Sequence, residues 1–295
     1  MKPQVLLAMR DWDYLTPLLL GDLASPDFDL LLKRVDRLPG LYPLPELCDA
    51  CELSFSQYVR ALDQGHCDMI GIPNFVMRGF RHRCVVTTRD SSLMALDELP
   101  GHRVALAGWP NSGHTWTRTA LLHQGVQLED ITWLECSDGP SPLEVLQRGE
   151  ADAAFLPFMP AGFFTPQAPL RPVQRNCLEQ ERHYLASVGY VPGIHILAVR
   201  QSLARRHPWL PQALSDLIDT ARQLWRSKRQ RYLDTSPWIN EQWQLCGADL
   251  PPHWDASGVD QNFRMISDFA ASLFRQGLTS RALHAHEIFP EHSRS

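Results

Sequence analysis

Short apolar runs alternate with amphipathic stretches along most of the chain. The apolar runs at 5–9, 68–72, 84–88, 104–107, 131–134, 153–156 and 193–199 predict buried strands. Helical spacing of apolar residues predicts helices at 55–62, 96–99, 114–124, 142–147, about 207–232 and about 260–275. Strands that alternate with helices in this way indicate an α/β protein with parallel or mixed sheets, covered by helices on both faces.

Residues that typically begin or end helices and loops agree with several of these predicted boundaries. Ser54 stands where it would cap the helix at 55–62, and Gly65 stands where it would stop it. The segment 158–175 is rich in proline and aromatic residues and predicts an irregular crossing. At 295 residues the chain is too long for one small core and fits two lobes.

Composition narrows the class of protein. The 28 basic and 33 acidic residues give a net charge of −5, which gives no reason to expect nucleic acid or an anionic membrane as partner. Five apolar residues at 5–9 are too few for a signal-peptide core, so we expect a cytoplasmic protein. Cys48 and Cys51 form the only CxxC pair, without a second pair for zinc, and the seven cysteines indicate buried thiols in a reducing compartment.

A basic cluster follows the predicted strand at 68–72. Arg78, Arg81, His82 and Arg83 lie within six residues, directly before the next predicted strand. Cations between two strands often face a cleft, where arginine grips carboxylates and histidine titrates near neutral pH. The alternative is a solvated basic loop.

Several segments carry a resemblance to known proteins. Residues 100–105, the helix after Ser112 and the Leu-x-x-Gly-Glu-Ala-Asp-Ala-Ala segment at 146–154 resemble the second lobe of a type II periplasmic-binding-protein fold. In addition, 52–58, 72–75 with 78–82, 115–118, 206–209 and 276–279 are similar, in the same order, to the 4,5-dihydroxyphthalate decarboxylase family. The loop at 135–141 is shorter than this resemblance implies, so the substrate itself stays open.

The resemblance implies a fold and a reaction. The fold would have two lobes, 1–98 plus 200–295 and 99–199, with mixed sheets flanked by helices and a ligand cleft between the lobes. The reaction would be that of a lyase, a decarboxylase in aromatic compound catabolism, acting without a metal or organic cofactor on a small anionic aromatic carboxylate. A homo-oligomer is neither required nor excluded.

Such a reaction needs a proton donor at the ring carbon and cations that orient the anion. The candidate donors are His82, His195 and, if a dry pocket keeps it protonated, Glu52. The candidate ligands of the substrate are Arg78, Arg81 and Arg118 as carboxylate clamps, Ser54, Ser56 and Ser112 before helices, and Trp116 as a stacking ring.

Each candidate has a structural alternative. His195, between two isoleucines, is as well explained as a hydrogen-bonded core histidine, and Glu52 and Ser54 as caps of the next helix. Arg118 suits a solvated helix face, and Trp116 suits the core. Two further classes of function also stay open: a binding protein for a small anion, serving a transporter or a cytoplasmic sensor, and an enzyme of the same fold that handles cofactor precursors.

Overall fold

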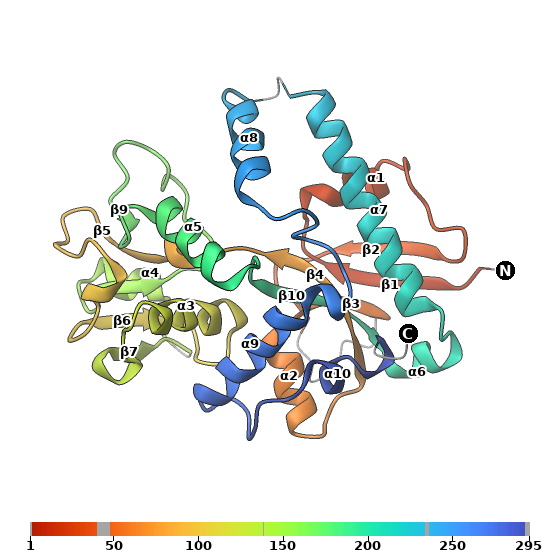
Figure 1. The fold of residues 1–295 in the computed structure, drawn as a ribbon, viewed down its shortest axis with the longest axis horizontal. Helices are drawn as coiled ribbons and strands as arrows, with labels where there is room; N and C mark the ends of the chain where they lie inside the picture. The colour runs from red at the N-terminus through yellow and green to blue at the C-terminus, as the bar shows by residue number, and fades with distance from the viewer. Residues whose placement is uncertain (1, 40–47, 138, 234–235, 293–295) are drawn as a thin grey trace.

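Two five-stranded mixed sheets, one in each lobe, organise the protein (Figure 1). The computed structural model describes residues 2–39, 48–137, 139–233 and 236–292. The first sheet has the order β2 (Asp29–Arg34), β1 (Gln4–Met9), β3 (Ala50–Ser54), β10 (Gly193–Arg200), β4 (Met69–Arg78). The second has the order β7 (Thr132–Glu135), β6 (Arg103–Leu106), β8 (Ala153–Phe155), β5 (Val85–Thr88), β9 (Leu170–Pro172).

Helices cover both faces of each sheet, as the α/β pattern predicts. The helices of the described chain are α1 (Thr16–Leu19), α2 (Phe55–Asp63), α3 (Ser112–His123), α4 (Pro142–Gln147), α5 (Cys177–Val188), α6 (Gln201–Arg206), α7 (Leu210–Arg231), α8 (Ile239–Asp249), α9 (Phe263–Arg275) and α10 (Ala285–Ile288). In the first lobe, α2 and α9 bury their apolar faces on one side of the sheet and α7 on the other. In the second lobe, α3 and α4 do the same on opposite sides.

The directions of the strands place the carboxyl ends of β1 and β3 and the start of β10 at the cleft between the lobes. β1 is parallel to β3, so the residues that follow both strands emerge at the same edge. β10 is antiparallel to β3 and begins at that edge, where His195 lies opposite Ser54. The chain segments after β1 and β3 and the start of β10 therefore meet at one place.

The crossings between the lobes differ from the expected boundaries at 98/99 and 199/200. β5 pairs with β8 and β9, so the chain leaves the first lobe between Arg78 and Val85. β10 pairs with β3 and β4, so the chain returns between Val188 and Gly193. Each boundary moves by about one strand because an isolated apolar run gives no sign of the sheet to which it belongs.

Some elements also differ from the prediction. β4 continues through Pro73 to Arg78, where the sequence suggests a loop after residue 72. Proline is tolerated there because β4 is the last strand of its sheet and its pairing with β10 is irregular between Ile72 and Phe75. β2, β3, α5, α6 and α8 were not expected, and β9 lies within the segment expected to be irregular.

Two observations bear on the expectations from composition. All seven cysteines are free thiols. Within the described part of the chain, no helix combines the length and the apolar character that crossing a bilayer demands.

Candidate functional site

A buried carboxylate and a histidine form the centre of the site. Glu52 lies in the middle of β3 and is completely buried, and His195 lies on the neighbouring strand β10 with 9% of its surface exposed. Nδ1 of His195 is 2.6 Å from Oε1 of Glu52. This bond occupies one ring nitrogen and leaves Nε2 as the nitrogen that can meet a bound molecule.

The turn after β1 holds the other carboxylate oxygen. Oε2 of Glu52 accepts hydrogen bonds from the backbone N–H of Arg10 at 3.0 Å and from Nε1–H of Trp12 at 2.8 Å. The guanidinium of Arg10 lies 3.8 Å from Oε1. The three contacts from Arg10 and Trp12 are all with donors, an arrangement that suits a carboxylate accepting from Nδ1–H of His195 and orienting the imidazole.

Three serines connect the two lobes beside this pair. The Oγ atoms of Ser54 and Ser112 are 2.7 Å apart, and Ser112 Oγ accepts the backbone N–H of Ser56 at 2.8 Å. Ser56 Oγ donates to the carbonyl of Pro110 at 3.0 Å. Ser54 makes no side-chain cap to α2, so Ser112 from the second lobe satisfies an N-terminal N–H of that helix instead.

Arg81 is a buried cation without an acidic partner. It lies in the crossing between the lobes, is 5% exposed, and its Nε has no hydrogen-bond partner. Its guanidinium packs against Gly113 in the first turn of α3, where an added Cβ would lie 2.9 Å from Nη2. In the described part of the chain no carboxylate lies within ion-pair distance of it, so the arginine lacks the anion that a buried cation requires.

A cavity of about 300 Å³ opens between the lobes at this point. Arg10, Ser54, Gln57 and His195 line it from the first lobe, and Asn111 lines it from the second. Arg10 also lies 5.0 Å over the ring of Phe158, which belongs to the second lobe. The volume lies at the lower end of the range of small-molecule sites.

Burial sets the electrostatics of the site. Desolvation lowers the pKa of His195, and the hydrogen bond to Glu52 opposes this shift. Desolvation also lowers the pKa of Arg81. An anion in the cavity would lie against His195, which lines it, and near Arg81, which does not line it but acts electrostatically on His195, and would favour the charged forms of both groups. The site is therefore suited to a negatively charged ligand.

Six of the sequence-predicted candidates meet here, and four lie elsewhere. Glu52, His195, Ser54, Ser56, Ser112 and Arg81 gather between the lobes. His82 packs against Tyr184 of α5 at 5.4 Å between ring centroids, and burial lowers its pKa to about 4. Trp116 is a core residue that donates to the carbonyl of Gly193 at 2.7 Å.

The other two arginine candidates have protein partners. Arg118 is buried, lies 3.8 Å over the ring of Trp109, and donates to Oε1 of Gln276 at 2.7 Å. Arg78 donates to Oδ1 of Asn262 at 2.6 Å. Neither lines the cavity beside His195.

Sequence reasoning missed Arg10, Trp12 and Asn111. The signal for Arg10 and Trp12 was their position directly after an apolar strand, but only the pairing of β1 with the unpredicted β3 brings them to Glu52. Asn111 caps α3 by accepting the N–H of His114 at 3.2 Å, and it also lines the cavity. Among the described residues there is no group of three or more His, Cys, Asp or Glu that could hold a metal ion.

Solved structures define the class of fold. The alkanesulfonate-binding protein SsuA from Xanthomonas axonopodis, solved with MOPS, matches with a TM-score of 0.62 over 98% of this chain and 98% of its own, at 16% identity. The periplasmic aliphatic sulphonate binding protein SsuA from Escherichia coli gives 0.61 over 99% and 97%, at 14% identity. The desulfurization enzyme DSZB gives 0.59 over 97% and 96%, at 15% identity. The chain therefore has the periplasmic-binding-protein fold, as expected from its sequence.

Curated sequences add a narrower relationship. A 4,5-dihydroxyphthalate decarboxylase from Comamonas testosteroni is 24% identical over 321 residues, which covers 98% of this chain and 96% of the relative. A protein of the same name from Pseudomonas putida is 30% identical over 87 residues, 29% of this chain and 34% of the relative. No protein-family model matches the chain. The resemblance to 4,5-dihydroxyphthalate decarboxylases that the sequence motifs indicate is thus confirmed.

Proposed function

We propose that this protein is a cofactor-independent decarboxylase of a small hydroxylated aromatic carboxylate, similar to 4,5-dihydroxyphthalate. The observation that carries the proposal is the combination, between the two lobes, of a buried arginine with no acidic partner among the described residues and a histidine held by a buried carboxylate. The first provides for an anionic substrate, and the second provides a positioned proton donor. The names of the sequence relatives support the same reaction.

The chemistry assigns a role to each group. Arg10, which lines the cavity, and Arg81 close to it bind the substrate carboxylates, and the hydroxyl of Ser54 supplies a further donor. An anion that enters the cavity favours the imidazolium form of His195, since the nearby negative charge offsets its desolvation. Glu52 accepts from Nδ1–H, so that Nε2–H faces the bound molecule.

The reaction then balances without an added reagent. Nε2 of His195 gives its proton to the ring carbon that bears the carboxylate, while a hydroxyl in para position supplies electron density to that carbon. The bond between the ring carbon and the carboxylate breaks, its electron pair returns to the ring, and carbon dioxide leaves. The neutral imidazole takes up a proton from solvent before the next cycle. Positioned acid catalysis of this kind contributes about 10²–10⁴ in rate.

Binding without catalysis is the second candidate, and the serine cluster favours it. Hydrogen bonds between Ser54, Ser56 and Ser112 already close the two lobes on each other at the cavity. Two solved structures of this fold are named as sulphonate-binding proteins, and one of them holds the sulphonate MOPS. A small anion held by serines and a helix N-terminus would suit such a role.

Carbon dioxide release distinguishes the two candidates. The purified protein is incubated with 4,5-dihydroxyphthalate and a panel of hydroxylated benzoates, and carbon dioxide and the decarboxylated product are measured. We expect turnover of at least one acid, with His195→Gln lowering it by about 10²-fold or more at nearly unchanged affinity. His82→Gln is the matched control, because His82 packs against Tyr184, and it should keep turnover.

Three results would contradict the proposal. Tight binding of an acid with no carbon dioxide released favours the binding protein. Equal turnover in His195→Gln and the parent protein removes His195 as the donor. Loss of turnover in His82→Gln alone, with the fold intact by circular dichroism, returns His82 to that role.

A further inference from the structure

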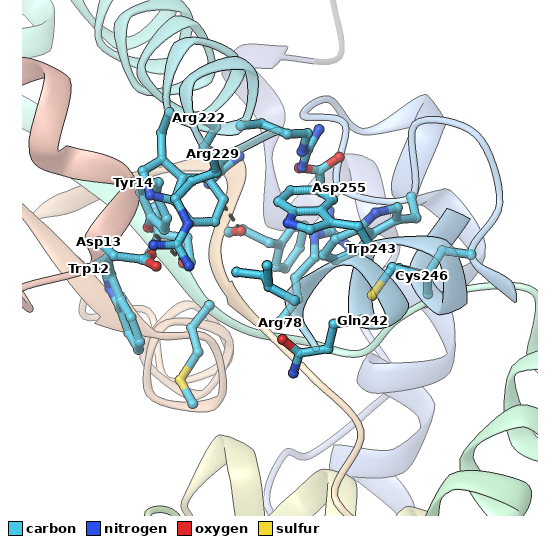
Figure 2. A pocket seen from close by; sticks show the side chains of 18 residues that line it. Trp12, Asp13, Tyr14, Arg78, Arg222, Arg229, Gln242, Trp243, Cys246 and Asp255 are labelled. Carbon is cyan, nitrogen blue, oxygen red and sulfur yellow. Dashed lines mark hydrogen bonds and ion pairs between the residues drawn. The ribbon is translucent and has the colours of Figure 1, made fainter. Parts of the chain in front are cut away.

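A second and larger cavity lies beside the site (Figure 2). It lies against α7 and α8, which together are called the α7–α8 arm. Its volume is about 510 Å³, within the range of small-molecule binding sites. The walls come from α7, α8, the last residues of β4 and the turn after β1. In Figure 1 the first part of α7 packs along the first sheet, while its last turns and α8 project beyond the sheet.

Aromatic side chains form much of its wall. Trp225 from α7 and Trp243 from α8 are 6.4 Å apart between ring centroids, and Trp254 follows α8. Trp12 and Tyr14 line it from the turn after β1. Flat rings on several sides favour a planar ligand, because stacked and edge-to-face contacts add to the gain from burying apolar surface.

The charged side chains of the wall are mainly basic. Four arginines line the cavity, at positions 78, 222, 226 and 229, against two aspartates, Asp13 and Asp255. Arg226 is paired with Asp255 at 2.6 Å, and Arg222 is paired at 2.9 Å with Asp219, which lies outside the lining. Arg78 and Arg229 then remain against Asp13, so the wall keeps a net positive charge.

Among the described residues, no carboxylate lies within ion-pair distance of Arg78 or Arg229, although Asp255 and Asp219 act on Arg78 from further away. Arg78 donates to Oδ1 of Asn262 and to two backbone carbonyls, all of them neutral, and its Nε is buried without a partner. The guanidinium of Arg229 lies 5.9 Å over the ring of Trp225. Desolvation lowers the pKa of Arg78 to about 9, a shift that an anion nearby would reverse.

We propose that this cavity is a second binding site, which takes a planar aromatic anion. The ring of the ligand lies among Trp225, Trp243 and Trp254, and its acidic group pairs with Arg229 at the rim and Arg78 further in. The arginines and the aromatic wall together favour an aromatic anion over other ligands. A neutral aromatic molecule would be stabilised by the ring contacts alone, and a small inorganic anion by the charge-assisted bonds alone. This assignment is independent of the reaction proposed for the cavity beside His195.

One residue links the two cavities. The ring of Trp12 lines the second cavity, while its Nε1–H donates to Glu52 at 2.8 Å. The two linings have no described residue in common, so Trp12 is connected to the first cavity through Glu52, which holds His195. A ligand in the second cavity therefore contacts the side chain that helps to hold the carboxylate of the first, without touching His195.

The experiment titrates the full-length protein with 1-naphthoate by isothermal calorimetry. We expect saturable binding, and Arg229→Gln should weaken it about tenfold or more by removing a charge-assisted bond. Trp243→Leu should weaken it by a similar factor through lost stacking and apolar contact. The neutral isostere 1-naphthalenemethanol should bind the parent protein at least about tenfold more weakly than the acid.

Matched variants on the same surface serve as controls. Arg231→Gln removes an arginine from the end of α7 that faces Tyr232, and Trp209→Leu removes a tryptophan before α7; both lie outside the lining and should leave affinity unchanged. Arg10→Gln tests whether the ligand occupies the cavity beside His195 instead.

Four outcomes overturn the proposal. The parent protein shows no binding up to millimolar 1-naphthoate; affinity is unchanged in both Arg229→Gln and Trp243→Leu while circular dichroism shows an intact fold; the neutral alcohol binds as tightly as the acid; or binding falls in Arg10→Gln and persists in the two variants of the arm. The last result would assign the ligand to the cavity between the lobes.

Discussion

Replacing Glu52 by glutamine changes one charge at the centre of the site and almost no volume. Oε2 of Glu52 accepts from the Arg10 backbone N–H and from Trp12 Nε1–H, and Oε1 lies against Nδ1 of His195. In Glu52→Gln the amide oxygen keeps the two bonds on the Arg10 side. The amide NH₂ then faces Nδ1, and because it can only donate, Nδ1 must become an acceptor.

The magnitude follows from the hydrogen bond that is lost. A bond to a charged group stabilises by about 1.5–3 kcal/mol, and here it stabilises the imidazolium over the neutral ring. Its loss lowers the ratio of protonated to neutral His195 by about one to two orders of magnitude. Burial, which already lowers the pKa of His195, is then no longer opposed by Glu52, and the pKa moves further down. Turnover should fall by about 10²-fold or more.

Two measurements check this prediction. NMR of the histidine ring nitrogens follows the titration and the tautomer of His195, whose signal is assigned as the one missing from the spectrum of His195→Gln. The release of carbon dioxide measures turnover. Glu181→Gln is the matched control, since Glu181 is also a buried carboxylate, but its partner is Arg83 and not a histidine. Unchanged titration of His195 together with unchanged turnover in Glu52→Gln would show that the carboxylate does not tune the histidine.

Two further predictions concern the arginine beside α3 and the response to pH. Gly113→Ala places a Cβ 2.9 Å from Nη2 of Arg81, so the guanidinium must move and calorimetry should show about tenfold weaker carboxylate binding, whereas Gly247→Ala, with open space around it, should bind as the parent does. Burial lowers the pKa of His82 and of His114 to about 4, so the unfolded chain binds protons there between pH 6.5 and 4 while the folded protein does not. The free energy of unfolding should therefore fall as the pH drops through this range, by up to about 1.4 kcal/mol per pH unit for each histidine. The free energy of unfolding, measured by urea denaturation at several pH values, should depend less steeply on pH in His82→Gln than in the parent or in His66→Gln, the control at an exposed histidine. An equal dependence on pH in all three proteins would contradict the burial argument.

The sequence predicted the strands and helices that carry strong periodic signals, and it failed where the signal depends on partners. The core strands β1, β6 and β8 and the helices α2 and α4 are close to their predicted ranges. β3 was missed because it is short and interrupted by Glu52, a charged residue in a position that is completely buried. Buried strand positions are usually apolar, and Glu52 departs from this pattern because its carboxylate belongs to the candidate site.

The candidate site shows the same limit. Glu52, Ser54 and Ser112 were predicted from their residue types and positions before helices, and these are local properties. Arg10 could be found only by knowing that β1 pairs with β3, and the pairing is a property of the sheet. His82 and Arg78 were chosen from the charge of their segment, but each has its own surroundings: Tyr184 for His82, and Asn262 for Arg78.

The buried carboxylate is what argues for catalysis over simple binding. A site that only binds an anion gains nothing from Glu52, because a buried carboxylate is costly to desolvate and repels the ligand. The protein nevertheless holds Glu52 with donors from Arg10 and Trp12 and aligns His195 against it at 2.6 Å. This arrangement makes sense if the histidine must change its protonation state during the cycle and keep its orientation while it does so. The pair is therefore the feature by which a decarboxylase built on a binding-protein fold would differ from a binding protein with the same serines and arginines.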